Sequence, residues 1–307
     1  MADAGTQESL AAIISLLRPQ CVVPKLISGA GAWSVRYDAQ ETTGFCIVLA
    51  GSCLLAPEGD HPLELREGDF LLFPRTPAFT MASDLDLAAT TVEPKHGREI
   101  RRGDPDAEAS MRMLGGYFQF DRANAQLLVK LLPPWLHIRR HEQGAERLTR
   151  IVELIGEEAL AERAGRELIL ERLVEVLLVE ALRVRLVDAP PRERGLLAGL
   201  SDPALARPLR GIHVNLARRW TVAELARSAG MCRAVFAERF AHTVGLPPMQ
   251  YLLEWRMANA RDLLGRDHLS LAEVAERIGY RSTSAFSTAF TRFTGQSPSE
   301  FARAKRG

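Results

Sequence analysis

Residues 221–252 read TVAELARSAGMCRAVFAERFAHTVGLPPMQYL, and residues 270–302 read SLAEVAERIGYRSTSAFSTAFTRFTGQSPSEFA. The second segment repeats the first. At an offset of 49 both contain Ala-Glu-x-Ala-x-x-x-Gly, and after one inserted residue both contain two phenylalanines four positions apart, then a glycine and a proline. Each copy has the pattern of a helix-turn-helix, and two such units in one chain indicate a protein that reads DNA.

Local signals define both ends of the first helix in each copy. A capping box, in which Ser or Thr is followed three positions later by Glu, starts the helix; the pairs are Thr221 with Glu224 and Ser270 with Glu273. Gly230 and Gly279 then stand where a left-handed residue ends a helix, and a second helix follows within three residues. This tight turn is what the motif requires.

The second helix of each copy has one face for the core and one for a DNA groove. Its two phenylalanines are four apart and therefore share a face; they are Phe236 and Phe240 in the first copy and Phe286 and Phe290 in the second. The opposite face gives the candidates for base contacts, namely Arg233, Ala234, Ala237 and Glu238, then Thr283, Ser284, Ser287 and Thr288. Their side chains suit guanine, cytosine N4 and thymine methyl groups. The alternative for any one of them is an ordinary solvated helix face.

Residues 249–266 carry apolar side chains at helical spacing and predict one long helix between the copies. A rigid connection would place the two recognition helices in successive major-groove segments, about 34 Å apart, on one face of the DNA.

The two copies resemble the AraC/XylS family of transcription regulators. The first carries G-x-x-P-x-x-Y-L at residues 245–252 and R-x-x-x-A-R-x-L-L at residues 256–264, and residues 278–301 match the carboxy-terminal signature of that family. One departure is Cys232, which stands where the family usually has a helix-capping Ser, and a thiol is a poor cap. The resemblance implies binding to double-stranded promoter DNA and contact with RNA polymerase.

The charges of the chain are divided unevenly. Residues 201–307 contain 16 Lys and Arg against 9 Asp and Glu, a net charge of +7, whereas the remainder has a net charge of −6. A basic domain on an acidic one fits phosphate binding by the carboxy-terminal part. The candidates at the DNA surface include Arg218, Arg219, Arg281, Ser282, Arg292, Arg303, Lys305 and Arg306, although some of the arginines are expected to be ordinary surface residues.

The amino terminus lacks a basic region, and its apolar run at residues 10–17 is too short for a signal peptide or a membrane span. We therefore expect a cytoplasmic protein without a membrane contact. The four cysteines include no C-x-x-C pair, so we expect no disulfide framework.

Short apolar runs separated by turn residues occupy the first 120 residues and predict a β-barrel or sandwich. Residues 33–37, 45–51 and 70–74 are examples. The segment resembles the cupin-type sensor domain that often precedes this kind of DNA-binding domain. Cupin metal sites use two or three His and a carboxylate, but only His61 and His96 occur here. We expect no metal, no cofactor and no enzyme activity.

The amino-terminal domain is therefore expected to sense a signal. Trp33 and Phe79 are candidates for a pocket that binds a small-molecule effector. Cys21, Cys46 and Cys53 are candidates for a redox switch, with Cys21 favoured because Cys46 and Cys53 stand in apolar strands typical of a core. Core packing is the alternative for all five residues.

Residues 145–186 turn helical and break near Ala164 and Gly165, which predicts a helical hairpin. Its second helix is apolar on more than one face, which indicates a homodimer contact or burial on the barrel of its own chain. We predict a sensor domain at residues 1–144, a dimerisation hairpin at 145–186, a linker at 187–202 and a DNA-binding domain at 203–307.

The sequence thus predicts an α+β chain, with a cupin-like β-barrel and helical hairpin followed by an all-α double helix-turn-helix domain. We predict a DNA-binding transcription regulator and expect activation of transcription more often than repression. In the predicted mechanism, a signal in the barrel changes how the hairpin or linker restrains the DNA-binding domain. Two alternatives are a thiol-based sensor that uses Cys21, and a cupin-type ligand-binding protein or enzyme without productive DNA binding.

Overall fold

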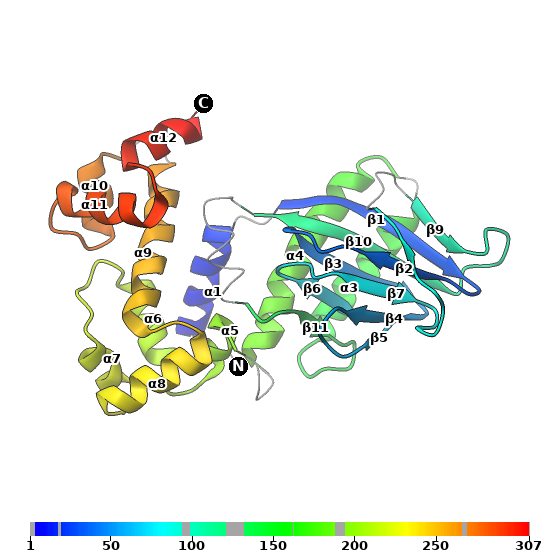
Figure 1. Ribbon diagram of the computed structural model, residues 1–307, viewed down its shortest axis with the longest axis horizontal. Helices are drawn as coiled ribbons and strands as arrows, with labels where there is room; N and C mark the ends of the chain where they lie inside the picture. Colours follow the sequence, from blue (N-terminus) through cyan, green and yellow to red (C-terminus); the bar gives the residue numbers. More distant parts are fainter. Residues whose placement is uncertain are drawn as a thin grey trace. The chain divides into compact units, whose positions relative to one another are not determined.

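The computed structural model describes residues 4–17, 20–93, 99–120, 132–161, 163–187, 194–265 and 269–306. The chain forms two compact units, one from residues 19–119 and 133–185, the other from residues 1–18, 120–132 and 186–307. The first unit is built on β-sheets and the second is helical (Figure 1). The predicted α+β class is confirmed.

Eleven strands form two sheets among the described residues of the first unit. The six-stranded sheet has the order β11-β6-β3-β10-β1-β9, from Leu136–Ile138, Phe70–Phe73, Thr43–Ala50, Met111–Gln119, Gln20–Ala30 and Glu99–Gly103. The five-stranded sheet has the order β5-β4-β7-β2-β8, from Leu63–Arg66, Ser52–Pro57, Phe79–Ala82, Ser34–Tyr37 and Thr90–Thr91. The two sheets share no strand. The predicted barrel therefore consists of two facing sheets and not of one closed sheet.

Apolar side chains from both sheets meet in one core. It includes Cys46, Leu71 and Met113 from the six-stranded sheet and Leu55 and Met81 from the five-stranded sheet. Period-two alternation sends these side chains to the face between the sheets and their neighbours to the opposite face. This alternation also fixes the register of the strands, because a one-residue slip would move the core set to the opposite face of its sheet.

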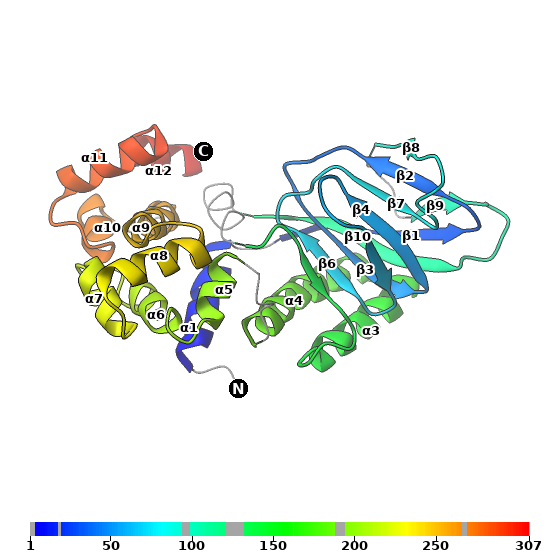
Figure 2. The ribbon, with the colours of Figure 1, turned by 60° about the horizontal axis from the view of Figure 1, so that its bottom comes forward.

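Two helices follow the sheets, as the sequence predicts. They are α3 (Glu146–Leu160) and α4 (Arg166–Val187), and the chain turns between them at Gly165, which has φ 80°. Both lie along one side of the two-sheet body, and α3 packs on β3 (Figure 2). One face of α3 is buried, since Leu148, Ile151, Val152 and Ile155 are each at most 8% exposed.

The helical unit contains eight carboxy-terminal helices within the part of the chain that is described. They are α5 (Leu196–Ser201), α6 (Ala206–Val214), α7 (Val222–Ser228), α8 (Arg233–Val244), α9 (Pro248–Leu264), α10 (Leu271–Arg277), α11 (Thr283–Thr294) and α12 (Pro298–Arg306). The predicted long helix between the repeats is α9. None of the described helices is long and apolar enough to cross a bilayer.

The amino-terminal helix α1 (Ala4–Leu17) belongs to this helical unit, where it packs against α6 and α9. Its side chains Leu10, Ile13 and Leu16 are at most 5% exposed. The predicted sensor domain at residues 1–144 includes this segment, because an apolar run does not show by itself which surface it covers.

An aromatic cluster around His213 fills the centre of the first half of the helical unit. The imidazole lies 4.4 Å from the Trp255 ring, and its Nε2 is 2.5 Å from the Tyr251 hydroxyl. Burial lowers the pKa of His213 to about 3, so the ring is neutral at physiological pH. Its Nδ1 has no hydrogen-bond partner among the described residues.

This depressed pKa predicts a pH-dependent stability. Between the folded-state pKa of about 3 and the ordinary value of 6.5, the unfolded chain binds a proton at His213 that the folded chain excludes. Stability is therefore full above pH 6.5 and is lost as the pH falls toward 3. We expect His213 to lower the free energy of unfolding by about 1 kcal/mol between pH 7.5 and 5.5. Urea unfolding of wild type and His213→Gln checks this, and parallel pH profiles of the two proteins would contradict it.

Candidate nucleic-acid interface and ligand cavity

The first helix-turn-helix consists of α7 and α8 and forms as the sequence predicts. The Thr221 hydroxyl accepts a hydrogen bond from the Glu224 amide at 3.2 Å, and the Glu224 carboxylate accepts one from the Thr221 amide at 2.9 Å. The capping box is therefore complete. Gly230 then turns the chain with φ 68° before α8 begins.

The second helix-turn-helix, α10 and α11, has the same construction. Ser270 and Glu273 form a complete capping box, and Gly279 has φ 85°. Gly279 also lies against the loop before α7, because a Cβ at this position would come within 2.5 Å of the Ala217 carbonyl oxygen. Gly230 has open space at the equivalent point. The second turn therefore requires glycine both for its positive φ and for the lack of space, whereas the first turn requires it only for its positive φ.

Both recognition helices are anchored by their phenylalanines. Phe236, Phe240, Phe286 and Phe290 are 0% exposed, and within each pair the rings lie 5.5 Å apart. The predicted base-reading residues lie on the other side: Arg233, Ala234, Glu238, Thr283, Ser284 and Thr288 are exposed, while Ala237 and Ser287 are half-buried. Arg281, Ser282 and Arg292 are exposed as well. The structure gives each recognition helix a free face, and contact of these residues with DNA stays a prediction.

The two recognition helices start differently. The Ser282 hydroxyl caps α11 by accepting a hydrogen bond from the Ala285 amide at 3.2 Å, whereas Cys232 makes no side-chain cap at α8. The expected weakness at Cys232 is therefore confirmed. Thr288 donates to the Ser284 carbonyl oxygen at 3.0 Å, which leaves its hydroxyl oxygen as an acceptor on the exposed face.

Long-range hydrogen bonds attach α8 and α9 to neighbouring parts of the helical unit. The guanidinium of Arg256 donates to the carbonyl oxygens of Leu216 and Arg218 at 2.8–3.2 Å, which ties α9 to the loop between α6 and α7. On the other side, Arg239 of α8 donates twice to Asp202, at 3.0 and 2.7 Å. α9 lies between the α7–α8 pair and the α10–α11 pair (Figure 1).

Val235 in the first recognition helix was not among the predicted base-reading residues. This side chain is 52% exposed on α8, beside Arg233 and Ala234. An exposed valine on a DNA-facing helix suits contact with a thymine methyl group. Its signal in the sequence was an apolar residue directly before Phe236, on a different face from the phenylalanine pair.

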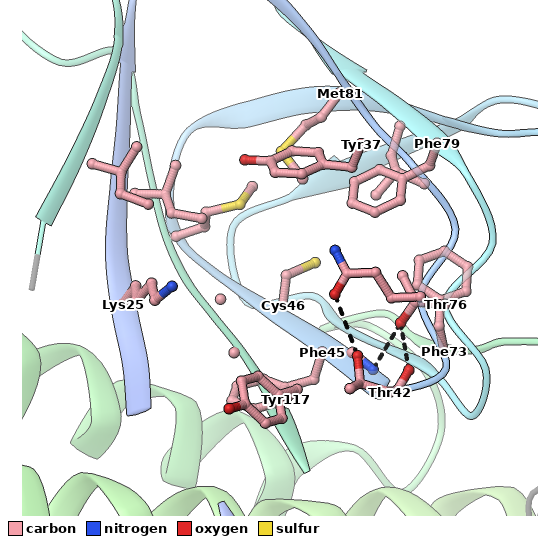
Figure 3. Close-up of a pocket in the computed structure, with 18 of the residues that line it drawn as sticks. Lys25, Tyr37, Thr42, Phe45, Cys46, Phe73, Thr76, Phe79, Met81 and Tyr117 are labelled. Atoms are coloured by element: carbon pink, nitrogen blue, oxygen red, sulfur yellow. Dashed lines mark hydrogen bonds between the residues drawn. The ribbon is translucent and has the colours of Figure 1, made fainter. Parts of the chain in front are cut away.

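The first unit contains a cavity of about 480 Å³ between its two sheets, partly open to solvent (Figure 3). Its walls are mainly apolar and include Ile27, Phe73, Phe79, Met81 and Met113. The rings of Tyr37 and Phe79 stack at 5.0 Å, and those of Phe79 and Phe73 at 6.1 Å, so one wall is a continuous aromatic surface. This size and composition are typical of a small-molecule site.

Hydrogen-bonding groups gather at one end of the cavity. The Thr76 hydroxyl accepts from the Gly44 amide at 3.0 Å and donates to the Thr42 carbonyl oxygen at 2.8 Å (Figure 3). Gln40 lies beside them and accepts from the Thr42 hydroxyl at 3.4 Å. Gly44 has a further role, because a Cβ there would meet the Thr76 hydroxyl at 2.7 Å.

The five candidates for effector or redox sensing are placed differently. Phe79 and Cys46 line the cavity, whereas Trp33 and Cys53 belong to the surrounding core and not to the cavity wall. Cys21 lies in β1, where its backbone pairs with Phe118, but its side chain lies outside the described residues.

The two described strand cysteines are poorly suited to redox sensing. Burial raises the pKa of the Cys46 thiol far above its usual value, helped by the nearby Cys53 and Asp69. Burial also raises the pKa of Cys53 to about 12. Since the thiolate is the reactive form, both thiols are protonated and inert at physiological pH.

A metal site finds no support in the described part of the chain, where no three His, Cys, Asp or Glu side chains are close enough to share an ion. His61 is exposed, and His96 lies outside the described residues.

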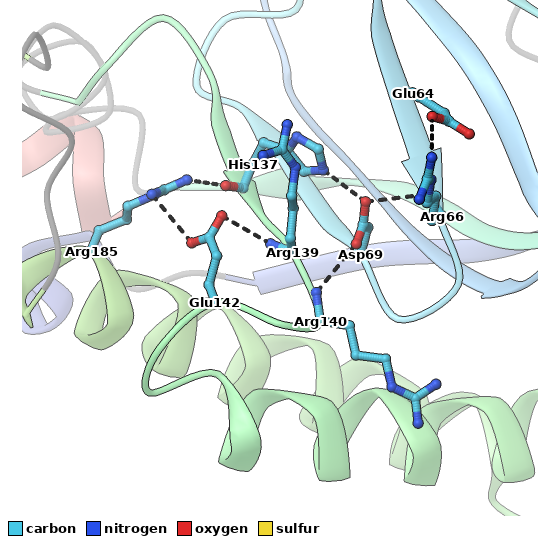
Figure 4. Close-up of polar contacts among 8 residues, drawn as sticks. All are labelled: Glu64, Arg66, Asp69, His137, Arg139, Arg140, Glu142 and Arg185. Carbon is cyan, nitrogen blue, oxygen red and sulfur yellow. Dashed lines mark hydrogen bonds and ion pairs between the residues drawn. The ribbon is translucent and has the colours of Figure 1, made fainter.

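A buried polar network lies beside the core at the turn between β5 and β6 (Figure 4). The Asp69 carboxylate is 2.9 Å from His137 Nε2 and accepts from the amides of Arg66 and Arg140 at 3.1 and 3.3 Å. Burial opposes ionisation of Asp69, but these hydrogen bonds outweigh it, and the pKa of the carboxyl is lowered. Asp69 is therefore a fixed buried anion.

The same network reaches the end of α4. Arg185 donates to the His137 carbonyl oxygen and forms an ion pair with Glu142 at 3.4 Å (Figure 4). Glu142 also accepts from the Arg139 amide at 3.2 Å. The network thus joins the turn before β6 to the last turns of α4, and β6 pairs with the cavity strand β3, where Leu71 stands opposite Cys46.

Comparison with known proteins finds the same two modules. Residues 8–186 match a family described as Cupin, and residues 225–304 match one described as Helix-turn-helix domain. A putative AraC-like transcription regulator of Streptomyces antibioticus is 35% identical over 296 residues, covering 94% of this chain and 96% of the relative. A relative of the same description from Streptomyces lividans is 36% identical with the same coverage.

Among solved structures, the DNA-binding domain of AdpA in complex with a target DNA is 36% identical, covers 34% of this chain and 95% of that chain, and gives a TM-score of 0.33.

The two modules define a helix-turn-helix regulator with an amino-terminal cupin domain. Within that class, the two full-length relatives settle the family: the chain belongs to the AraC family of transcription regulators. The predicted resemblance is confirmed.

The difference between the two helix caps is testable. Ser282→Ala removes the cap of α11 and is expected to lower the free energy of unfolding by about 1 kcal/mol, whereas Cys232→Ala removes no cap and is expected to change it by less than about 0.5 kcal/mol. Urea unfolding of the full chain, with hydrogen exchange at residues 283–290 and 233–240, measures both. Equal losses in the two variants would contradict the asymmetry.

Proposed function

We propose that this protein is a sequence-specific DNA-binding transcription regulator that responds to a small molecule. The observation that carries the proposal is the pair of helix-turn-helix motifs, each with a recognition helix anchored by two buried phenylalanines and free on its opposite face. Membership of the AraC family supports the same function. In this proposal the protein acts in the cytoplasm and has no enzyme activity.

The two recognition helices read two neighbouring elements of one promoter. α9 and the Arg256 contacts fix the relative position of the motifs, which suits two major-groove segments separated by one helical turn, about 34 Å. The net charge of +7 on residues 201–307 supplies affinity for phosphates, and the exposed side chains of α8 and α11 supply the sequence preference. Activation then follows from contact with RNA polymerase.

The effector binds in the cavity of the cupin unit. Polar contacts through Asp69, His137 and Arg185 connect the start of β6, which pairs with the cavity strand β3, to the end of α4. A ligand that favours one arrangement of these contacts shifts the population of DNA-competent molecules by its difference in affinity for the two states.

The helices α3 and α4 form a homodimer contact in this proposal. Of the nine large apolar side chains that are exposed among the described residues, five lie on these two helices: Leu154, Leu160, Leu168, Ile169 and Val176. Ile169, the half-buried Leu173 and Val176 follow the i, i+4, i+7 spacing of a helix stripe. Such a stripe suits packing against the same helix of a second copy.

Selection of DNA fragments by the purified full chain at about 150 mM salt tests the DNA-binding function. We expect a motif with two elements about one helical turn apart. Glu238→Ala is expected to relax one element and Thr288→Ala the other, each by about 1–3 kcal/mol of discrimination. Glu254→Ala on α9 is the control and should leave the motif unchanged. Featureless binding by the wild type would refute the proposal.

Light scattering of the full chain at micromolar concentration tests the dimer. The double variant Ile169→Glu, Val176→Glu places two charges in the proposed contact, and we expect it to be monomeric where the wild type is dimeric. Val214→Glu changes a valine that is 57% exposed on α6 and should leave the dimer intact. A wild type that is itself monomeric, or a dimer that survives the double substitution, argues against this contact.

A further inference from the structure

The cupin unit contains a buried guanidinium without a described carboxylate partner. Arg102 lies in β9 and is 9% exposed. Its Nη2 donates to the Tyr37 hydroxyl oxygen at 2.8 Å, while its buried Nε has no hydrogen-bond partner among the described residues. None of the ion pairs between described residues includes Arg102.

Strand pairing places this cation next to the cavity. Ile100 and Arg102 are the two buried residues of β9 and point to the same face, and Ile100 lines the cavity together with Ile27, its neighbour on β1. Arg102 follows Ile100 by two residues on the same face of β9 and pairs with Gly29 of β1. Tyr37 lines the cavity (Figure 3). Arg102 therefore contacts the cavity wall through the phenol.

The direction of the Arg102 to Tyr37 hydrogen bond decides what the phenol can do. A guanidinium has no acceptor, so the phenol oxygen accepts and its own proton is left to donate elsewhere. A positive charge on the far side of the oxygen makes that proton a stronger donor. The Tyr37 hydroxyl is therefore prepared for an electron-rich oxygen of a bound molecule.

Burying an unpaired charge is costly in free energy, and proteins normally pair it. Lys25 and Glu93 also line the cavity and carry opposite charges, so Arg102 gives this region its net positive charge. We infer that the cavity binds a small apolar monocarboxylate, whose carboxylate accepts a hydrogen bond from Tyr37 and compensates the charge of Arg102. This inference rests on the proposed sensing function.

The cavity walls decide against two other ligand classes. A sugar needs many hydrogen-bonding partners around its ring, but the surface of this cavity is mainly apolar. A phosphate ester carries more charge than a single guanidinium can balance and usually binds several donors. A carboxylate with an aromatic or aliphatic body matches one cationic end and an apolar remainder.

Isothermal titration and thermal unfolding of the full chain, without DNA, test the inference. The probes are benzoate and decanoate, each compared with its neutral amide, benzamide and decanamide. At least one carboxylate is expected to raise the Tm and to bind about tenfold or more tightly than its amide, in line with one hydrogen bond to a charged group. In Arg102→Met and in Tyr37→Phe this preference is expected to disappear.

Arg101→Met is the matched control, because Arg101 is the neighbour of Arg102 on β9 and its side chain contacts the carbonyl oxygens of Asp104 and Ala107. It should keep the carboxylate preference. Tyr37→Phe keeps the aromatic stack and covers the case in which Arg102→Met does not fold. The inference is overturned if neither carboxylate binds, if acid and amide bind equally to the wild type, or if the preference survives in Tyr37→Phe. None of these results bears on DNA selection, so the two proposals fail separately.

Discussion

The fixed spacing of the two recognition helices is the constraint on which the DNA-binding unit depends. α9 runs between the motifs, and Arg256 attaches it to the carbonyl oxygens of Leu216 and Arg218, forty and thirty-eight residues earlier. Gly279 meets the same loop at Ala217, where a side chain would collide. Hydrogen bonds from a guanidinium to main-chain oxygens are short and directional. They therefore resist sliding of α9 along the loop better than apolar packing alone. Two helices held in this way can meet DNA as one rigid surface.

The two motifs share a scaffold but differ in what they offer to DNA. Each is anchored by a phenylalanine pair that is fully buried, so the backbone positions are equivalent. The exposed face of α8 carries Arg233, Val235 and Glu238, whereas that of α11 carries Thr283, Ser284 and Thr288. Charged and apolar groups discriminate between bases more strongly than hydroxyls, which serve several bases. The copy with the weaker helix cap is thus the copy with the more selective side chains.

In the cupin unit, burial acts on ionisable groups in two opposite ways. It keeps Cys46 and Cys53 protonated, which removes the thiolates that a redox sensor needs. It leaves Arg102 charged without a described carboxylate partner, which is the condition under which a bound anion contributes most. Asp69 differs from both, because hydrogen bonds from His137 and two amides compensate its burial. The two described strand cysteines are therefore unsuited to thiol chemistry, whereas Arg102 leaves a positive charge beside the cavity.

The sequence by itself determined the features that depend on neighbours along the chain. The sequence predicted the capping boxes, the left-handed glycines and the break between α3 and α4, because each depends on residues only a few positions apart. It also showed the duplicated motif directly. Only the tertiary structure decided the rest: the packing of α1 on α6 and α9, two open sheets in place of a barrel, and the contact of Arg102 with Tyr37 across 65 residues. Such contacts depend on which strands pair and which faces meet. Periodicity shows that a face is buried, but not what covers it.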